Sequence, residues 1–291
     1  MSLPKIARID RRYLYIVVVI LVSFPLLYPF GWARQRLVIS EHTTNLLIFT
    51  ESLPAGRIVI ESFDFGPSTI PENRPQAKAH IFHCKQLGLK VVALAFWPGG
   101  APIGDLILRE VYGGAFPNIP EYGTDVVYLG YVPGNEVGMQ TFGDNTWNAK
   151  GTDHYGTAIG TIPLMQQCRS AANFSLWAEW TSGDPGITQV VQFVQGRHGG
   201  PSAVPIVTGA TAVSVPGIMP YYSAGQIAGI LNGMVGAGEY EKLLIDAYNY
   251  PFTDALNGLD SQSTGHLIII AFVIIGNIGY AISKYRGGKT S

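Results

Sequence analysis

Side chains that could bind a metal lie close together near residue 80. His80, His83 and Cys84 form an H-x-x-H-C motif in the segment from Pro75 to Gly88, which predicts a helix ended by its last glycine. Residues three or four positions apart share a helical face, so His80 and Cys84 could bind one ion. The sequence offers no second pair of ligands, and a metal site needs several. Packing in the core is therefore the favoured interpretation, and we predict no metal and no cofactor.

A second group of acid–base residues lies in an irregular stretch of Gly, Asp, Asn and Thr from Gly143 to Gly160. Asp153, His154 and Tyr155 could donate or accept protons there. A histidine in a polar loop is more often simply solvated.

Familiar catalytic motifs are absent from the sequence. It contains no G-x-x-x-x-G-K-[ST] phosphate loop, no G-x-G-x-x-G, no H-E-x-x-H and no G-x-S-x-G. The segment GGAPIGD, from Gly99 to Asp105, has the glycines of a phosphate loop but an aspartate where the lysine should be. These absences argue against an enzyme without excluding one.

Strands and helices are predicted to alternate through the middle of the chain. Expected strands cover residues 57–63, 90–96, 125–131, 174–180 and 203–208, and expected helices cover 41–52, 75–88, 103–112 and 187–195. Several of the strands are almost wholly apolar, which is typical of a parallel sheet buried on both faces. We predict an α/β fold with a doubly wound, mostly parallel sheet of five or more strands, flanked by one N-terminal and one C-terminal transmembrane helix.

Each predicted strand is followed by a segment rich in Gly, Pro, Ser or Thr, such as DFGPST at 64–69 and TSGDPG at 181–186. The carboxyl ends of parallel strands meet at one edge of a sheet, where ligands usually bind in this class of fold. Turn residues are also needed there whether or not a ligand binds. The polar groups that we predict to bind a ligand at this edge are Asp64, Ser68, Asn135, Ser182 and Asp184.

Two apolar segments lie near the ends of the chain. Tyr13 to Trp32 is twenty residues without a charge, and His266 to Ser283 is similar in character. A helix of twenty residues spans about 30 Å, the thickness of the hydrocarbon core of a bilayer. We therefore predict transmembrane helices at 13–32 and 266–283 and a middle domain at 33–265.

Basic residues flank these segments unequally. Lys5, Arg8, Arg11 and Arg12 precede the first, and Lys284, Arg286 and Lys289 follow the second. The positive-inside rule then places two basic tails, residues 1–12 and 284–291, in the cytoplasm and the middle domain outside it. A cleaved signal peptide is the alternative for the first segment, but no small-x-small cleavage site follows it.

Only two cysteines occur in the chain. Cys84 and Cys168 could form one disulfide in an exported domain, but two cysteines are too few for a disulfide framework. A buried free thiol is the favoured interpretation for Cys84, because free cysteine is among the most buried residue types.

A run without charge extends from Gly199 through Gly238 and contains glycines at four-residue spacing. Gly225, Gly229 and Gly233, followed by Ala237, would form a groove of small residues on one helix within Met219 to Ala247. This run could be a third membrane span, a helix buried against the sheet or a subunit interface. The last two interpretations are favoured, and Gly276 and Gly279 offer a similar smooth patch in the second apolar segment.

These features together favour a membrane-anchored, self-associating scaffold. Its predicted partners are the lipid bilayer, further copies of the chain and other membrane proteins. Nucleic acid is not expected, because the net charge is −1 and only 13% of residues are charged. The alternative is a small-molecule-binding module or an enzyme that uses the strand-end edge, with Asp64 and Asp184 as acid, base or orienting groups.

Overall fold

The computed structural model describes residues 11–287. The chain divides into two compact units: Leu37–Ala255 forms one, and Met1–Arg36 with Leu256–Ser291 forms the other. The boundaries predicted for the middle domain, residues 33 and 265, lie a few residues outside the first unit. Most of the two predicted basic tails, residues 1–10 and 288–291, lies outside the described residues.

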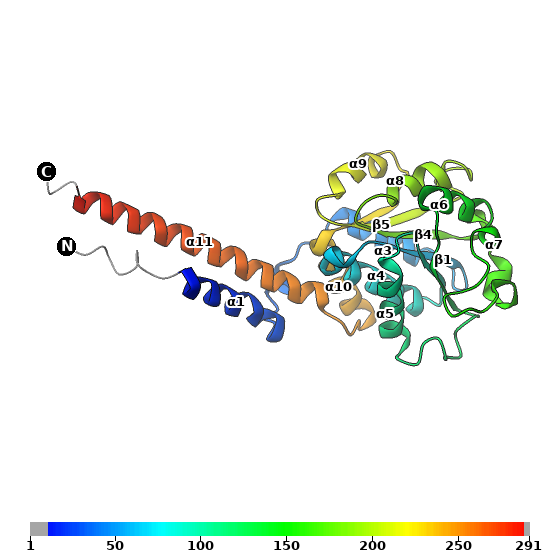
Figure 1. Ribbon diagram of the computed structural model, residues 1–291, viewed down its shortest axis with the longest axis horizontal. Coiled ribbons are helices and arrows are strands. Elements are labelled where there is room, and N and C mark those ends of the chain that lie inside the picture. The colour runs from blue at the N-terminus through cyan, green and yellow to red at the C-terminus, as the bar shows by residue number, and fades with distance from the viewer. Residues whose placement is uncertain (1–10, 288–291) are drawn as a thin grey trace. The chain divides into compact units, whose positions relative to one another are not determined.

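The unit Leu37–Ala255 is built on a six-stranded, all-parallel sheet with the order β3-β2-β1-β4-β5-β6 (Figure 1). The strands are β1 Ile58–Asp64, β2 Lys90–Ala95, β3 Val126–Tyr131, β4 Leu176–Thr181, β5 Ile206–Ala210 and β6 Gly229–Asn232. The predicted α/β fold with a parallel sheet is therefore confirmed. The strand order is that of Rossmann-type folds.

Helices cover both faces of this sheet because side chains of each strand alternate between two apolar clusters. Ile60 of β1 and Trp177 of β4 pack on one face, and Phe63 and Trp180 pack on the other. The first face is covered by α6 Asn135–Asp144, α8 Ile187–Gln189, the π-helical segment Val190–Gln195 and α9 Val215–Ser223. The second is covered by α3 Glu41–Glu51, α4 Ile70–Gln86, α5 Gly100–Tyr112 and α10 Gly233–Tyr248.

The predicted glycine groove on one helix is wrong. Gly225 lies in the turn after α9 with φ +73°, Gly229 lies on β6, and Gly233 begins α10 with φ +55°. A methyl group on Gly229 would lie 2.4 Å from the backbone of Leu46 in α3, so this glycine lets α3 pack directly on β6. Gly233 and Ala237 lie four residues apart in α10 as predicted, and both are buried.

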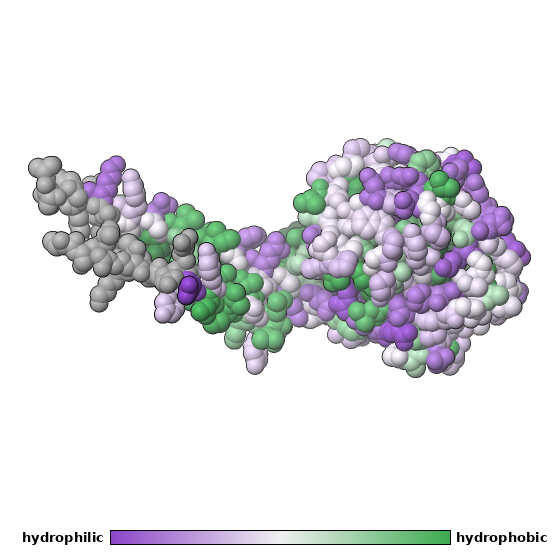
Figure 2. Space-filling view, in the orientation of Figure 1, coloured by the Kyte–Doolittle hydropathy of each residue, from purple (hydrophilic) through white to green (hydrophobic). Residues whose placement is uncertain are grey.

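The second unit contains α1 Arg11–Leu27 and α11 Asp254–Gly287, which begins at the end of the α/β unit. The two helices lie side by side and antiparallel, because the Ser261 hydroxyl donates to the Val22 carbonyl at 2.6 Å while Asp260 accepts from the amide of Gly31. Hydrophobic side chains are exposed along both helices (Figure 2). Among the described residues, one helical segment, Asp254–Ala281, is long and apolar enough to cross a membrane.

The predicted helix at 13–32 is not reproduced at that length. α1 ends at Leu27, before Pro29, and a proline disfavours helical backbone in the residue that precedes it. Gly31 then has φ +71°. The amides of Gly31 and Ala33 both donate to the carboxylate of Asp260 at 2.8 Å, which fixes this bend. As a helix, α1 alone is therefore shorter than a span requires.

Candidate functional site

The edge where β1 and β4 end side by side is the switch point of the sheet. The connections from β1 and β4 lead to helices on opposite faces, and ligands bind at such points in doubly wound folds. Three loops meet here, after β1, β2 and β4. The backbone of Gly100, after β2, lies against the end of β1, and only glycine fits there, because a methyl group on Gly100 would lie 1.8 Å from the Phe63 carbonyl oxygen.

The side chain of Asp64, the last residue of β1, is hydrogen-bonded to the loop after β2. Its Oδ1 accepts from the backbone amides of Phe96 at 2.5 Å and Trp97 at 3.0 Å, and its Oδ2 accepts from the Ser62 hydroxyl at 2.6 Å. The backbone amide of Ser182 donates to the Asp64 carbonyl at 3.1 Å. Asp64 is fully buried, so it positions the loops and does not face an incoming ligand.

A second fully buried carboxyl group, Glu179, lies within hydrogen-bonding reach of Asp64. Burial raises the pKa of Glu179 well above its ordinary value, and the negative charge of Asp64 raises it further. Burial likewise raises the pKa of Asp64, although hydrogen bonds from Glu179, Ser62 and the two backbone amides partly oppose this. Two carboxyl groups can hydrogen-bond to each other only when one is protonated, so the raised pKa values favour one proton shared by the pair.

Glu179 has one oxygen with a donor and one without. Its Oε2 accepts from Trp177 Nε1 at 3.0 Å, whereas Oε1 is buried and has no hydrogen-bond partner. A protonated Oε1 would satisfy both this atom and Asp64. The unpaired Oε1 atom and the raised pKa of Glu179 thus both favour a protonated Glu179.

Four of the five ligand residues predicted from the sequence come together at this edge. Ser68 follows β1, while Ser182 and Asp184 follow β4; Ser68 and Asp184 are exposed and Ser182 is half-buried. Asn135 begins α6 beyond β3, two strands away from β1. The structure thus places Asp64, Ser68, Ser182 and Asp184 at one edge and leaves Asn135 apart from them. That these residues bind a ligand stays a prediction.

Trp97 is a residue of this edge that the sequence did not single out. Its indole Nε1 donates to the Pro185 carbonyl at 2.7 Å, and a methyl group on Gly183 would lie 3.3 Å from its ring. The half-exposed indole therefore joins the loop after β2 to the loop after β4. An aromatic ring beside serine and aspartate is a common composition for a small-molecule site.

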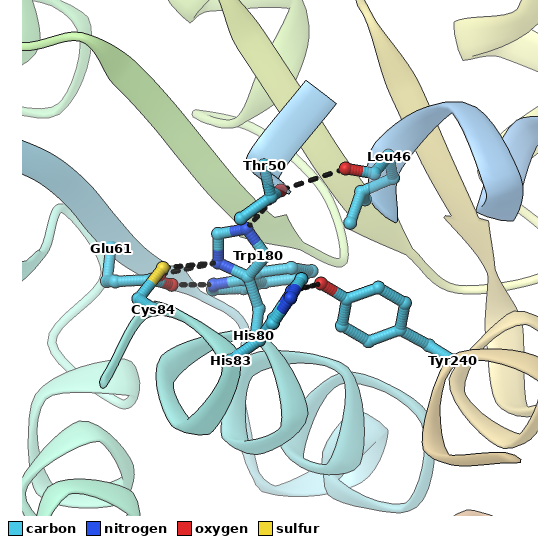
Figure 3. Close-up of polar contacts among 8 residues, drawn as sticks. All are labelled: Leu46, Thr50, Glu61, His80, His83, Cys84, Trp180 and Tyr240. Carbon is cyan, nitrogen blue, oxygen red and sulfur yellow. Dashed lines mark hydrogen bonds and ion pairs between the residues drawn. The ribbon is translucent and has the colours of Figure 1, made fainter. Parts of the chain in front are cut away.

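A separate cluster of titratable side chains lies inside the opposite layer, between β1 and α4 (Figure 3). His80 Nδ1 is 2.6 Å from Glu61 Oε1, and Cys84 Sγ is 3.6 Å from that nitrogen and 3.7 Å from that oxygen. All three side chains are fully buried. His83 points elsewhere, and its Nδ1 is 2.6 Å from the Tyr240 hydroxyl.

Two neighbours fix the orientation of this cluster. The Thr50 hydroxyl donates to the Leu46 carbonyl at 2.8 Å, so its oxygen accepts the proton of His80 Nε2 at 3.2 Å. Trp180 Nε1 donates to Glu61 Oε2 at 2.6 Å. His80 Nδ1 and Glu61 Oε1 then share one proton between them.

The cysteines remain free thiols, and both are buried. Burial raises the pKa of Cys84 well above its ordinary value, and the carboxylate of Glu61 adds to this. Burial raises the pKa of Cys168 to about 12. The Cys168 thiol donates to the Leu164 carbonyl at 3.4 Å, whereas the Cys84 thiol lies beside His80 and Glu61.

The polar loop residues Asp153 and Tyr155 have structural partners. The Tyr122 hydroxyl donates to Asp153 at 2.8 Å, and the Tyr155 hydroxyl donates to Asp105. His154 is exposed beside them. These contacts fold the loop, and they do not assemble an acid–base pair.

Comparisons of the chain with protein-family models, curated proteins and solved structures find no match.

Proposed function

We propose that this protein is a bilayer-anchored α/β module that binds a small polar molecule at the switch-point edge. The observation that carries the proposal is the convergence of the loops after β1, β2 and β4, which Asp64 fixes through two backbone amides and a hydroxyl. A site needs such rigid support if its binding groups are to be held in place.

Three groups at the edge would contact the ligand. Ser68 and Asp184 offer exposed polar atoms, and the indole of Trp97 offers an apolar face. Asp64 and Glu179 would act one layer below, as positioning residues. No reaction is proposed, because the buried carboxyl pair does not reach the surface of the edge.

The anchor would be formed by α11 together with α1. Exposed apolar side chains on both helices support contact with lipid. Because the helices are antiparallel, both ends of the chain would leave the bilayer on the same side, and the basic residues near them favour the cytoplasmic side. The α/β unit would then be extracytoplasmic.

Thermal melting of the full chain in detergent tests ligand binding. Inorganic phosphate, ATP, NAD and glucose, each at millimolar concentration, are suitable probes. A ligand at 100 times its Kd stabilises the native state by about 2.7 kcal/mol, which raises Tm by roughly 5–10 °C in a unit of this size. We expect at least one probe to raise Tm.

A matched pair of variants locates the binding site. Asp184→Arg changes an exposed acid at the carboxyl edge, and Asp125→Arg makes the same change at the amino edge, just before β3. We expect the first to abolish the Tm rise and the second to preserve it. Failure of every probe to shift Tm, or equal loss in both variants, would contradict the proposal.

Self-association through the apolar helix is a second candidate function. A methyl group on Gly276 or Gly279 would meet open space, so this patch of α11 is free for another helix to approach. The test is the native mass in mild detergent. Gly279→Leu should reduce an oligomer to the monomer while Ile278→Leu should not, and a monomeric wild-type chain would refute this function.

A further inference from the structure

Glu61, His80 and Cys84 form a compact set of three different metal-binding side chains. One comes from β1 and two come from successive turns of α4, and their ligand atoms all lie within 4.8 Å of one another. We propose that this cluster is a zinc site that joins the sheet to α4. It is separate from the switch-point edge, because Glu61 and Asp64 lie on opposite faces of β1.

The spacing of the ligand atoms suits a tetrahedral ion. Zinc lies about 2.3 Å from a thiolate and about 2.0–2.1 Å from an imidazole nitrogen, which places such atoms about 3.5 Å apart. Cys84 Sγ is 3.6 Å from His80 Nδ1 and 3.7 Å from Glu61 Oε1. The 2.6 Å between His80 and Glu61 is a hydrogen-bond distance, so these two atoms must separate by about 0.7 Å to admit an ion.

The surrounding contacts are those expected around a metal ligand. A ligating histidine usually donates its other ring proton to a neighbouring acceptor, and the Thr50 hydroxyl oxygen is 3.2 Å from His80 Nε2. This contact leaves Nδ1 as the ligating nitrogen. Trp180 Nε1 holds the other carboxylate oxygen of Glu61 at 2.6 Å, so Oε1 alone faces Cys84 and His80 (Figure 3).

Charge also favours a divalent ion over other occupants. A thiolate, a carboxylate and a neutral imidazole carry two negative charges, which one divalent cation balances inside a fully buried cluster. The thiolate and imidazole select zinc over magnesium and calcium, which prefer oxygen ligands. Three protein ligands leave a fourth position for a water molecule.

Zinc uptake has a defined proton balance. Before binding, the Cys84 thiol carries one proton, and a second is shared by His80 Nδ1 and Glu61 Oε1. Zinc binds the thiolate, the carboxylate and Nδ1, so the thiol proton leaves to solvent and the proton between Nδ1 and Oε1 is displaced. Zinc binding therefore releases protons to the solvent.

The test uses the full chain in detergent, stripped with a chelator and then given zinc or cobalt(II). We expect one zinc ion per chain by elemental analysis, and a thiolate-to-cobalt charge-transfer band in the cobalt form. Cys84→Ser should weaken zinc binding at least 10–100-fold and remove the band. Cys168→Ser, which changes the other buried free cysteine, should do neither.

Calorimetry of the wild-type chain in buffers of different ionisation enthalpy provides a test that needs no variant. Release of protons on zinc binding supports the site, because the Cys84 thiol must lose its proton to bind the ion. Absence of stoichiometric zinc and of the charge-transfer band in the wild-type chain would overturn it, and so would unchanged affinity in folded Cys84→Ser. In that event the three side chains form only a closed hydrogen-bonded network.

Discussion

Replacing Glu179 by glutamine tests whether the buried carboxyl pair holds a proton. Glutamine has the shape of a protonated glutamate, since its oxygen can accept from Trp177 and its amide group can donate to Asp64. It cannot ionise. The native state of the variant therefore keeps the same hydrogen bonds at every pH.

The expected pH dependence follows from the direction of the pKa shift. Unfolded Glu179 ionises near its ordinary pKa of 4.5, whereas the folded group retains its proton to a higher pH. The folded state thus binds more protons, so wild-type stability falls as pH rises above about 4.5, by about 1.4 kcal/mol per pH unit. As the pH rises from about 4.5 toward the folded pKa, Glu179→Gln should therefore gain stability relative to the wild-type chain, by at most about 1.4 kcal/mol for each pH unit.

Chemical denaturation of the full chain in detergent, followed by tryptophan fluorescence at several pH values, measures this difference. Glu136→Gln is the matched control, because Glu136 is exposed and its replacement should change stability by less than about 0.5 kcal/mol. Parallel pH profiles for the wild-type chain and Glu179→Gln would refute the shared proton.

Two further substitutions test the packing that positions the sheet. Lys78→Ala should destabilise the chain by about 2 kcal/mol in a denaturation experiment. The reason is that Lys78 is buried in α4 and its ammonium group pairs with Asp254 at the start of α11. A loss of stability below about 0.5 kcal/mol would show that the pair is solvated. Gly229→Ala should lower the free energy of unfolding by about 1–3 kcal/mol, because the new methyl group meets the Leu46 backbone. The control is Gly217→Ala, whose methyl group meets nothing within 4 Å and which should be neutral or stabilising. Equal stabilities of the two variants would contradict the packing of α3 on β6.

Apolar runs were sufficient to predict the first five strands within about three residues, because buried parallel strands have a distinctive composition. β6 was missed because it has only four residues and begins with a glycine. The four-residue glycine spacing around it fits a helix equally well in sequence. Only the turn at Gly225 and the packing of α3 on Gly229 distinguish the strand from a helix.

The candidate sites were predicted in part, for a related reason. Asp64 ends β1, and Ser68 and Asp184 lie in loops that follow strands, so their common edge could be inferred from the order of elements. Glu61 lies inside a strand, and the sequence gives no sign that it meets His80, because that contact exists only after α4 packs on the sheet. Long-range partners of polar residues in strands depend on packing that local patterns do not contain.

Hydrogen–deuterium exchange of the full chain, with and without the probes named above, tests the central claim of a ligand-binding edge most directly. A bound ligand should slow exchange in the loops after β1, β2 and β4, including the amides near Ser68, Trp97 and Asp184, and leave the amino edge near Asp125 unchanged. Unchanged exchange in these three loops with every probe, or protection at the amino edge instead, would contradict the account.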